Sequence, residues 1–431
     1  MGKVFSKQRL LAELNNCSFY PGIDPEELAG KLSILAGIGT TVEGGITRFP
    51  YTDEEKSAKE IFKSWMEEIG LIVREDSLGN IFGVLEGEDP SLPIVLTGSH
   101  LDSVPNGGAF DGPLGCLSSL LAMKAITETG TKPKRSIELV VFVDEEGARF
   151  GNGLFGSRVM MGEVTASDLK NFKDDQGNLL YDEMKKAGFN PDGLASCYRK
   201  HEDIFAFLEL HIEQGKRLES ENKQIGVVHG IAGPSWGSII FYGETDHAGN
   251  TPMEYRKDTV AAAAEFILEV EKSPRMFSQT AVATVGKITV FPNGSNVISG
   301  RTELSVDVRD IDEQARDNLL AHLEAKADEI AKKRGLSFEV EEGIKIPPVI
   351  VPEHIQQTIR TASENNGLSV LTVISGAGHD AMSLGRYVPS GMIFVPSHNG
   401  KSHSPEEWTS LPDCVNGVQV LKESILSLAN Q

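Results

Sequence analysis

The chain has 431 residues, of which 40% are hydrophobic, and a formal net charge of −21, because 62 acidic residues outnumber 41 basic ones. A chain of this length exceeds the usual limit for one hydrophobic core, so we expect two domains. The acidic surplus argues against nucleic acid and anionic membranes as partners, because phosphate groups are bound through basic surfaces.

Cysteine usage and the N-terminal residues indicate the compartment. The four cysteines lie far apart and form no C-x-x-C pair, which is typical of a reducing compartment and argues against a sulfur-ligated metal. The N-terminal segment has no apolar signal core, and no run approaches eighteen apolar residues. We therefore expect a cytoplasmic protein without a membrane span. The first thirty-odd residues carry no motif to which a role can be assigned.

The first strong element in chain order is a helix over about 53–69. Thr52 and Glu55 form a capping-box pattern, apolar residues repeat on one helical face, and Gly70 is a stop signal. The runs LIVRE and NIFGVLEG that follow predict a hairpin that turns at about 77–80.

Apolar strands then alternate with helices. The runs PIVLTG and SIELVVFV flank a predicted helix over about 113–129, and FAFLEL adds another strand after a polar, helix-containing excursion over 163–200. Such β-α-β alternation predicts a largely parallel sheet with helices on both faces, and therefore an α/β fold.

The pattern changes in the middle of the chain. IGVVHGI, SWGSIIFYGE, TVGKITVFP and RTELSVDVRD predict antiparallel strands, interleaved with helices over about 258–271 and 312–334. These elements predict a compact α+β insert over 217–342. The first domain then comprises residues 1–216 and 343–431.

Two strand ends are rich in polar side chains. GSHLDSVPNGGAFDG supplies His100, Asp102 and Asp111, and VVFVDEEGARFG supplies Glu145 and Glu146. In open α/β sheets, ligands bind outside the carboxyl ends of the strands. Imidazole and carboxylate groups are the ligands that divalent metals such as zinc prefer. The two segments together predict a metal site.

Two further segments carry histidines in similar contexts. FAFLELHIEQG places His211 and Gln214 after an apolar strand, and NGKSHSPEEW places His403 in a polar loop. We interpret His100, His211 and His403 as ligands. An ordinary structural role is the interpretation for four other histidines: His201, His322, His354 and His398.

The spacing of these residues suggests which side chains can bind metal and which can orient the ligands or face the reacting water. His100 and Asp102 are two apart at a strand end, so their side chains leave on the same face. One can bind metal while the other orients the neighbouring groups. Glu145 and Glu146 are adjacent and point to opposite sides in extended backbone. One can be a ligand while the other faces the reacting water.

The order GSHLDSV, GGAFDG, DEEGARF, ELHIEQG, DHAGNTPM, NVISG, DVRD, SGAGHDAM and SHSPEEW resembles the dinuclear-metal amidohydrolases. That group includes N-carbamoyl-L-amino acid hydrolases and allantoate amidohydrolases, and it is related to aminoacylases and carboxypeptidase G. The resemblance runs from about Gly45 to Trp408. It implies an α/β catalytic domain with a mostly parallel sheet and a dinuclear metal site. It also implies that the insert is a ferredoxin-like α+β domain serving as lid and dimerisation domain.

The resemblance also implies the metal ligands. Two divalent ions per subunit are expected, of zinc, manganese, cobalt or nickel. Asp111 bridges them in this assignment. His100 and His211 complete one site, and Glu146 and His403 complete the other.

Catalytic roles follow from the same resemblance. Glu145 is expected to be the general base that takes a proton from water and delivers it to the leaving nitrogen. Asp102 supports the catalytic groups by orienting them. His247 is expected to stabilise the oxyanion, joined by Asn296. The structural alternative for His247 is that it is an ordinary histidine in a turn.

Substrate binding requires a further group. Arg309 ends the run TELSVDVRD, and the resemblance assigns it to the substrate carboxylate, which its guanidinium can bind through two hydrogen bonds. Pairing with Asp307 or Asp310 is the structural alternative. Weaker candidates for the substrate pocket are Gln214, Gly378 and His379.

The expected reaction is hydrolysis of a ureido C–N bond in a small carboxylate-bearing substrate. GGAFDGPLG and GIAGPSW favour an N-carbamoyl-L-amino acid hydrolase, whereas SGAGHDAM and VPSHNGKSH favour an allantoate amidohydrolase of ureide catabolism. An N-acyl-amino acid aminoacylase or dipeptidase is less favoured, because HIEQG places a histidine where peptidases commonly have an acidic ligand. A non-catalytic metal-binding module is opposed by Glu145 beside Glu146, because a silent site needs no base. We also expect a homodimer through the insert.

Overall fold

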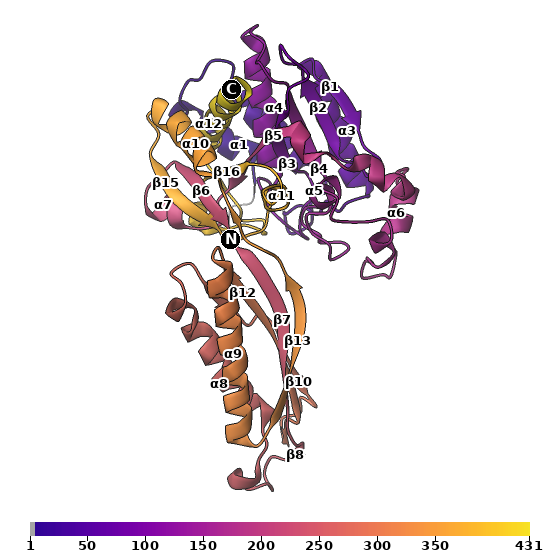
Figure 1. Cartoon of the computed structure of the whole chain (residues 1–431), viewed down its shortest axis with the longest axis vertical. Coiled ribbons are helices and arrows are strands. Elements are labelled where there is room, and N and C mark those ends of the chain that lie inside the picture. The colour runs from indigo at the N-terminus through magenta and orange to yellow at the C-terminus, as the bar shows by residue number, and fades with distance from the viewer. Residues whose placement is uncertain (1–4) are drawn as a thin grey trace. The chain divides into compact units, whose positions relative to one another are not determined.

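The computed structural model describes residues 5–431 and divides into two compact units (Figure 1). The larger unit comprises Met1–His229, Val351–Val373 and His379–Gln431, and the smaller unit comprises Gly230–Ile350 and Ile374–Gly378. Among the described residues, no helix has the length and apolar character needed to cross a membrane.

A nine-stranded sheet, most of which lies in the larger unit, has the order β1-β2-β4-β3-β5-β16-β6-β14, and β15 pairs with β6. The four central strands β4, β3, β5 and β16 are parallel, and β1, β2, β6 and β14 are antiparallel to their neighbours. The fold is therefore α/β with a mostly parallel centre, as the sequence predicts. The strands of this sheet are β1 (Ile72–Glu75), β2 (Ile81–Leu85), β3 (Ile94–His100), β4 (Ile137–Phe142), β5 (Ile204–Ile212), β6 (Ile225–Ile231), β14 (Val349–Ile350), β15 (Val370–Ser375) and β16 (Ser390–Val395).

Helices pack against this sheet. Helix α4 lies against β3 and β5 and also contacts α2 and α12. It is buried along most of its length, which explains why its sequence is apolar on every side. The helices of the larger unit are α1 (Lys7–Leu11), α2 (Pro25–Ala36), α3 (Asp53–Glu68), α4 (Pro113–Glu128), α5 (Phe155–Met160), α6 (Leu180–Lys186), α7 (Arg217–Ser220), α10 (Glu353–Asn365), α11 (Asp380–Leu384) and α12 (Leu411–Ala429).

Helix α3 confirms the predicted element over 53–69 and shows one difference at its cap. The Thr52 hydroxyl accepts the N–H of Glu55 at 3.4 Å, as expected. The Glu55 carboxylate, however, accepts the N–H of Tyr51 at 2.7 Å, where a capping box would use the N–H of Thr52. Glu55 also forms a buried ion pair with Lys59 at 2.7 Å. The carboxylate therefore closes the turn before the helix as well as pairing within it.

The longer elements of the smaller unit follow the order β7, α8, β10, β12, α9, β13, with the short strands β8, β9 and β11 between them. Its five-stranded antiparallel sheet has the order β10-β12-β7-β13, with β9 beside β12, and a separate ladder joins β8 to β11. Alternate residues of β12 are buried, and they pack with residues of α8 and α9 into the unit's own core. Its elements are β7 (Gly233–Tyr242), β8 (Asp246–His247), α8 (Thr259–Lys272), β9 (Val282–Thr284), β10 (Ile288–Phe291), β11 (Val297–Ile298), β12 (Arg301–Asp310), α9 (Glu313–Arg334) and β13 (Ser337–Lys345).

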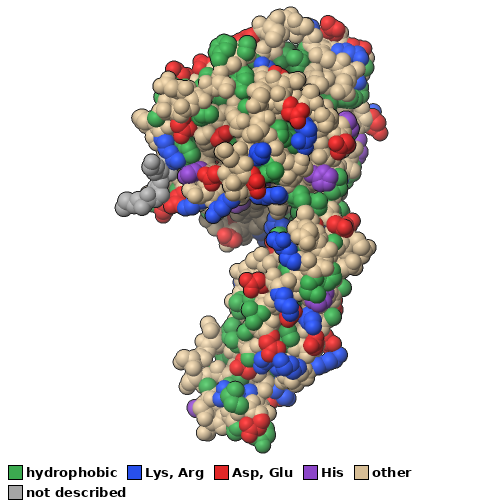
Figure 2. Space-filling model, turned by 90° about the vertical axis from the view of Figure 1, so that its left-hand side faces the viewer, with side chains coloured by type: hydrophobic (Ala, Val, Ile, Leu, Met, Phe, Trp, Pro, Cys, Tyr) green, Lys and Arg blue, Asp and Glu red, His purple; other side chains and the backbone are tan. Residues whose placement is uncertain are grey.

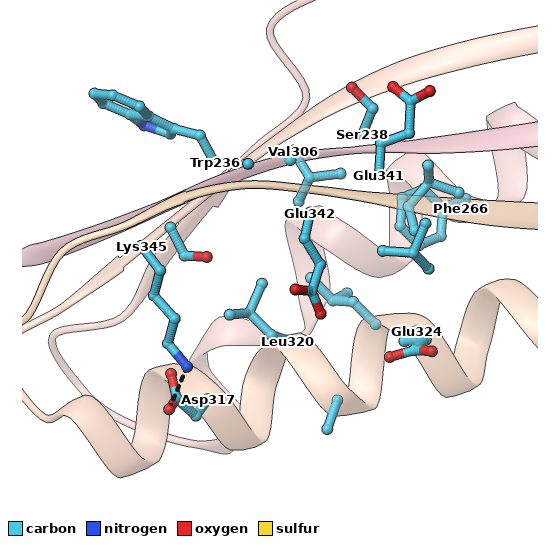
Figure 3. A pocket seen from close by; sticks show the side chains of 17 residues that line it. Trp236, Ser238, Phe266, Val306, Asp317, Leu320, Glu324, Glu341, Glu342 and Lys345 are labelled. Atoms are coloured by element: carbon cyan, nitrogen blue, oxygen red, sulfur yellow. Dashed lines mark hydrogen bonds and ion pairs between the residues drawn. The ribbon is translucent and has the colours of Figure 1, made fainter. Parts of the chain in front are cut away.

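A pocket of about 310 Å³ lies within this smaller unit (Figure 3). Leu320 and Glu324 of α9 line one side, and Trp236 and Lys345 of the neighbouring strands lie opposite. Lys345 forms an ion pair with Asp317 at its rim, 2.6 Å apart. None of the candidate metal ligands lines it.

The limits of the smaller unit differ from the expected insert over 217–342. Strand β6, predicted as part of the insert, pairs with β16 and with β14 and β15. Nearly every residue of β6 is buried, so its sequence is a continuous apolar run without clear alternation. Such a run shows that a strand is buried but not which sheet it joins. At the other end, β13 continues to Lys345, beyond the expected limit.

Candidate metal centre

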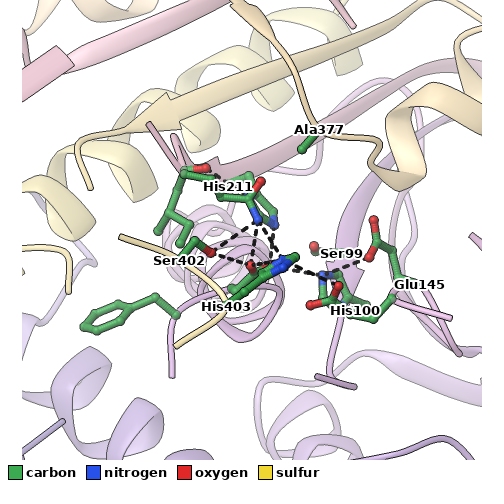
Figure 4. Close-up of polar contacts among 12 residues, drawn as sticks. Ser99, His100, Glu145, His211, Ala377, Ser402 and His403 are labelled. Atoms are coloured by element: carbon green, nitrogen blue, oxygen red, sulfur yellow. Dashed lines mark hydrogen bonds and ion pairs between the residues drawn. The ribbon is translucent and has the colours of Figure 1, made fainter. Parts of the chain in front are cut away.

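The predicted ligands come together at the carboxyl ends of the parallel strands of the larger unit (Figure 4). His100 is the last residue of β3, His211 lies near the end of β5, and Glu146 follows β4. Asp111 precedes α4, and His403 lies in the loop between β16 and α12. The ligand atoms of His100, Asp111 and His211 lie within 4.8 Å of one another, and so do those of Asp111, Glu146 and His403.

The carboxylate of Asp111 is shared by both groups. Its Oδ1 lies 3.1 Å from Nε2 of His211 and 3.6 Å from Nε2 of His100. Its Oδ2 lies 3.3 Å from Nε2 of His403, and that nitrogen lies 3.6 Å from Oε2 of Glu146. One oxygen therefore faces two histidines and the other faces a histidine and a glutamate. This is the arrangement in which a carboxylate can bridge two cations.

The histidine rings have the orientation that metal binding requires. Nδ1 of His211 lies 2.9 Å from the carbonyl oxygen of Ile212, and Nδ1 of His100 lies 3.1 Å from that of Asp102. In the neutral ring, an N–H at Nδ1 donates to each carbonyl, and Nε2 presents its lone pair to the cluster. Both Nε2 atoms are buried and lack a hydrogen bond. Because buried polar atoms are nearly always satisfied, these residues fit a divalent metal.

Asp102 lies behind the ligands and joins two of the strand ends. Its Oδ1 accepts the N–H of Glu145 at 3.2 Å and its Oδ2 accepts the N–H of Glu146 at 3.0 Å. The same Oδ1 lies 3.5 Å from Nδ1 of His100. The carboxylate thus connects the end of β3 to the turn after β4, a geometry suited to orienting its neighbours.

Glu145 and Glu146 face different partners. Oε2 of Glu145 lies 3.6 Å from Nε2 of His100, whereas Glu146 approaches His403. Burial raises the pKa of Glu145 well above its ordinary value, against the opposing effect of His100. Burial and the charge of Asp111 raise the pKa of Glu146 to about 7. Glu145 also lies within 4.8 Å of the ligand atoms of His100 and Glu146, so either glutamate can reach a metal.

Two residues of the centre are not predicted from the sequence. The Ser402 hydroxyl lies 2.9 Å from Oδ2 of Asp111. Glu407 is buried and accepts the backbone N–H groups of Phe110 and Asp111 at 2.8 and 3.1 Å. Both lie in the motif SHSPEEW, but a serine or glutamate in a polar loop is ordinarily solvated. Only their contacts with a distant segment set them apart.

Two substrate-pocket candidates also lie in this region. The side-chain amide of Gln214 donates to Oδ2 of Asp111 at 2.7 Å. The His379 ring is buried, with its centroid 4.4 Å from that of His211. Burial lowers the pKa of His379 well below its ordinary value, so this ring is neutral. Gly378 precedes it as the last residue of the segment Ile374–Gly378.

The proposed oxyanion groups lie in the smaller unit. His247 is exposed on β8, and its Nδ1 accepts the N–H groups of Gly249 and Asn250, both at 3.1 Å. Its proton is therefore on Nε2, which is free to donate. The carbonyl oxygen of Asn296 accepts the N–H of Ala248 at 3.0 Å. His247 thus lies in β8, and Asn296 directly precedes β11, the strand that pairs with β8.

Arg309, in the smaller unit, forms the ion pair that was its structural alternative. Its Nε and one terminal nitrogen donate to the Asp307 carboxylate at 3.0 and 2.9 Å. Its other terminal nitrogen donates to the carbonyl oxygen of Gly376 at 2.7 Å. Asp310 is buried and accepts the hydroxyl of Thr280. A substrate carboxylate bound by Arg309 must therefore compete with Asp307.

Comparison with known proteins identifies related sequences and folds. The sequence profile described as peptidase family M20/M25/M40 matches residues 96–427. An N-carbamoyl-L-amino acid amidohydrolase of Geobacillus stearothermophilus is 42% identical over 94% of this chain and 99% of its own length. An allantoate amidohydrolase of Bacillus subtilis is 38% identical over 94% of this chain and 100% of its own. An amidase of the hydantoinase/carbamoylase family from Burkholderia multivorans has a solved structure that is 35% identical. It superposes with a TM-score of 0.89 over 95% of this chain and 98% of its own.

Metal uptake by the metal-free protein should release protons. The hydrogen bond with Asp111 raises the pKa of His403 to about 9, so its imidazole is charged at pH 7.5. A ligand must be neutral to bind, so metal displaces that proton, and affinity should rise with pH up to about 9. Titration calorimetry in buffers of different ionisation enthalpy measures the released protons. The His403→Asn variant should release fewer protons than the wild type. The control variant His398→Asn, changed at an exposed histidine, should release as many protons as the wild type. A binding enthalpy independent of buffer would contradict this assignment.

Proposed function

The chain belongs to peptidase family M20/M25/M40, and we propose that it is a metal-dependent amidohydrolase that cleaves the ureido C–N bond of a carboxylate-bearing substrate. The observation that carries the proposal is the Asp111 carboxylate, which lies between two groups of metal-binding side chains. The names of the relatives support the ureido specificity. N-carbamoyl-L-amino acids are the first substrate candidates, and allantoate is the alternative.

The proposed site would hold two divalent ions. Asp111 would belong to both sets of ligands, with His100 and His211 in one set and Glu146 and His403 in the other. Zinc, manganese, cobalt and nickel all suit imidazole and carboxylate ligands. Such ions, when bound, supply Lewis acidity that polarises a carbonyl and makes water acidic near neutral pH.

The remaining steps belong to side chains of the chain itself. Glu145 takes a proton from the attacking water and delivers it to the leaving nitrogen as the C–N bond breaks. Asp102 keeps His100 and the glutamate turn in position. His247, with Nε2–H as its donor, and Asn296 stabilise the negative charge that develops on the attacked oxygen. Arg309 binds the substrate carboxylate. Gln214, Gly378 and His379 complete the proposed pocket.

An assay panel tests the proposed reaction directly. N-carbamoyl-L-methionine, allantoate and an N-acetyl amino acid are incubated with protein reconstituted with Mn²⁺, Co²⁺, Ni²⁺ or Zn²⁺. Ammonia release from a ureido acid, together with a much slower reaction of the N-acetyl compound, is the expected result. The better ureido acid distinguishes the two substrate candidates. Absence of turnover on both ureido acids with every metal would contradict the proposal.

The smaller unit is proposed to be the lid and dimerisation domain of a homodimer. Its β-α-β-β-α-β order is that of a ferredoxin-like fold. Among the described residues, twelve of the eighteen exposed large hydrophobic side chains belong to it, although it comprises fewer than a third of the chain. Figure 2 shows such apolar side chains on its visible face. This enrichment of exposed apolar side chains in one unit supports contact with a partner subunit.

The proposed compartment is the cytoplasm. The four cysteines are free thiols, and three of them are buried. This usage suits a reducing compartment, in which structural disulfides are rare.

Changing the proposed base should separate catalysis from metal binding. Glu145→Gln should retain two metal ions per subunit while kcat falls by roughly 10²–10⁴, the usual contribution of general acid–base help. Glu146→Gln, at the adjacent position, should instead lose metal. Metal content by atomic emission and kcat on the best ureido acid are measured together. If Glu145→Gln lost metal and Glu146→Gln did not, Glu145 would be the ligand and Glu146 the base.

Arg309→Ala should lower kcat/KM on ureido acids by roughly 10–200-fold, because a lost charge-assisted hydrogen bond is worth about 1.5–3 kcal/mol. A neutral amide analogue of the substrate should be affected far less. Asp307→Asn is the matched control, since it keeps the guanidinium and removes its competing carboxylate. That variant should retain or raise kcat/KM. Equal losses on both substrates with Arg309→Ala would show a purely structural arginine.

Mixing two inactive variants tests whether one site draws on two chains. His247→Ala and Glu145→Gln subunits are combined, and subunit exchange is verified by mass spectrometry. Partial recovery of activity is expected if His247 of one subunit serves the metal centre of the other. If the activity of the exchanged mixture stays at the level of the separate variants, His247 acts within its own chain or outside catalysis.

A further inference from the structure

We propose that Glu407 is a positioning residue that fixes Asp111 relative to His403 and thereby sets the affinity of the centre for metal. The inference rests on the proposed metal site. It concerns a side chain that is not among the candidate ligands and joins two loops that carry them. These are the Asp111 loop (residues 107–112) and the His403 loop (residues 397–408).

One oxygen of Glu407 binds the backbone of the Asp111 loop. Its Oε1 accepts the N–H of Phe110 at 2.8 Å and the N–H of Asp111 at 3.1 Å. Glu407 is 1% exposed, so water does not compete for these donors. A carboxylate that accepts two backbone N–H groups in a buried place makes strong hydrogen bonds. The backbone direction at Asp111 is therefore set by a residue nearly three hundred positions away.

The second oxygen of Glu407 reaches the side chain of Asp111 through Ser402. Oε2 lies 2.9 Å from the Ser402 hydroxyl, which in turn lies 2.9 Å from Oδ2 of Asp111. Ser402 immediately precedes His403 in the chain. The contacts form a closed ring: Glu407 holds the backbone of Asp111, and Ser402 lies between the two carboxylates. The ring fixes the Asp111 oxygen that faces His403.

The Asp111 loop is shaped around this carboxylate. A Cβ at Gly108 would lie 2.0 Å from Oε1 of Glu407, so any larger residue would displace the carboxylate. The rings of Phe110 and Trp408 pack edge to face with centroids 5.5 Å apart. Burial raises the pKa of Glu407 to about 7.

The adjacent residue provides a matched comparison. Glu406 has the same side chain, but it is 38% exposed and forms an ion pair with Lys401. A surface pair of this kind contributes little to stability. The two glutamates therefore differ in their contacts alone, and a change at each should separate positioning from loss of charge in the loop.

The experiment compares Glu407→Ala, Glu407→Gln and Glu406→Ala with the wild type. Glu407→Ala should weaken metal binding 10–100-fold, the usual cost of losing a residue that orients a ligand. Glu407→Gln should stay close to the wild type, because its amide oxygen can accept both N–H groups and its NH₂ can donate to Ser402. Glu406→Ala should not change. Competition with a chromophoric chelator measures the affinity.

A second readout does not depend on metal. Hydrogen exchange of the Phe110 and Asp111 amides in the metal-free protein should accelerate in Glu407→Ala and stay slow in Glu407→Gln and Glu406→Ala. If Glu407→Ala does not fold, Ser402→Ala removes only the hydroxyl link and should weaken metal binding in the same direction.

Four outcomes bear on this inference, and the last of them separates it from the proposed function. Wild-type amide protection in Glu407→Ala would overturn the positioning role, and so would accelerated exchange with unchanged metal affinity. Weak metal binding in both Glu407→Ala and Glu407→Gln would show that charge matters instead of hydrogen bonding, and would also overturn it. If the wild type bound no divalent ion while Glu407→Ala still released the two amides, the proposed metal centre would fail, and with it the effect of Glu407 on metal affinity. The contact by which Glu407 positions the Asp111 backbone would stand.

Discussion

The candidate centre depends on a buried carboxylate, that of Asp111, which is satisfied from several sides at once. Burying a charged group is costly unless it is paired and hydrogen-bonded. Burial alone would raise the pKa of Asp111, but the charge of His211 and contacts with the other histidines hold it well below its ordinary value. Gln214 also donates to the same carboxylate. These partners come from three separate segments, the ends of β3 and β5 and the loop before α12, so the position of Asp111 sets the geometry of the whole cluster.

The parallel sheet makes this convergence possible. Strands β3, β4 and β5 run in one direction, so the loops after them meet at one edge. The loops can approach one another this closely only where a glycine, which has no side chain, occupies the contact. Gly112 has φ of +81°, and a Cβ there would lie 2.4 Å from the His100 ring. Gly108 makes the corresponding space for Glu407. The glycines of GGAFDG are therefore as much a part of the centre as the ligands they flank.

The sequence predicts the parts of this structure that repeat a local rule. Helix α3, the β1–β2 hairpin and the parallel pair β3–β4 follow from periodicity and capping, and polar residues at strand ends locate the cluster. It fails where a residue's environment is decided far along the chain. Glu406 and Glu407 are indistinguishable in SPEEW, yet only Glu407 is buried against a loop near residue 108. Likewise, the apolar run of β6 does not reveal which sheet it joins.

The groups proposed to bind metal and the groups proposed to bind substrate lie in different units of the chain. The candidate ligands and Glu145 belong to the larger unit, whereas His247, Asn296 and Arg309 belong to the smaller one. In the proposed assignment, metal affinity therefore depends on the larger unit, which also holds the orienting contacts of Asp102 and Glu407. The smaller unit carries groups suited to a carboxylate and a developing oxyanion. A change in the smaller unit should alter turnover without altering metal content, and this separation makes the two sets of roles independently measurable.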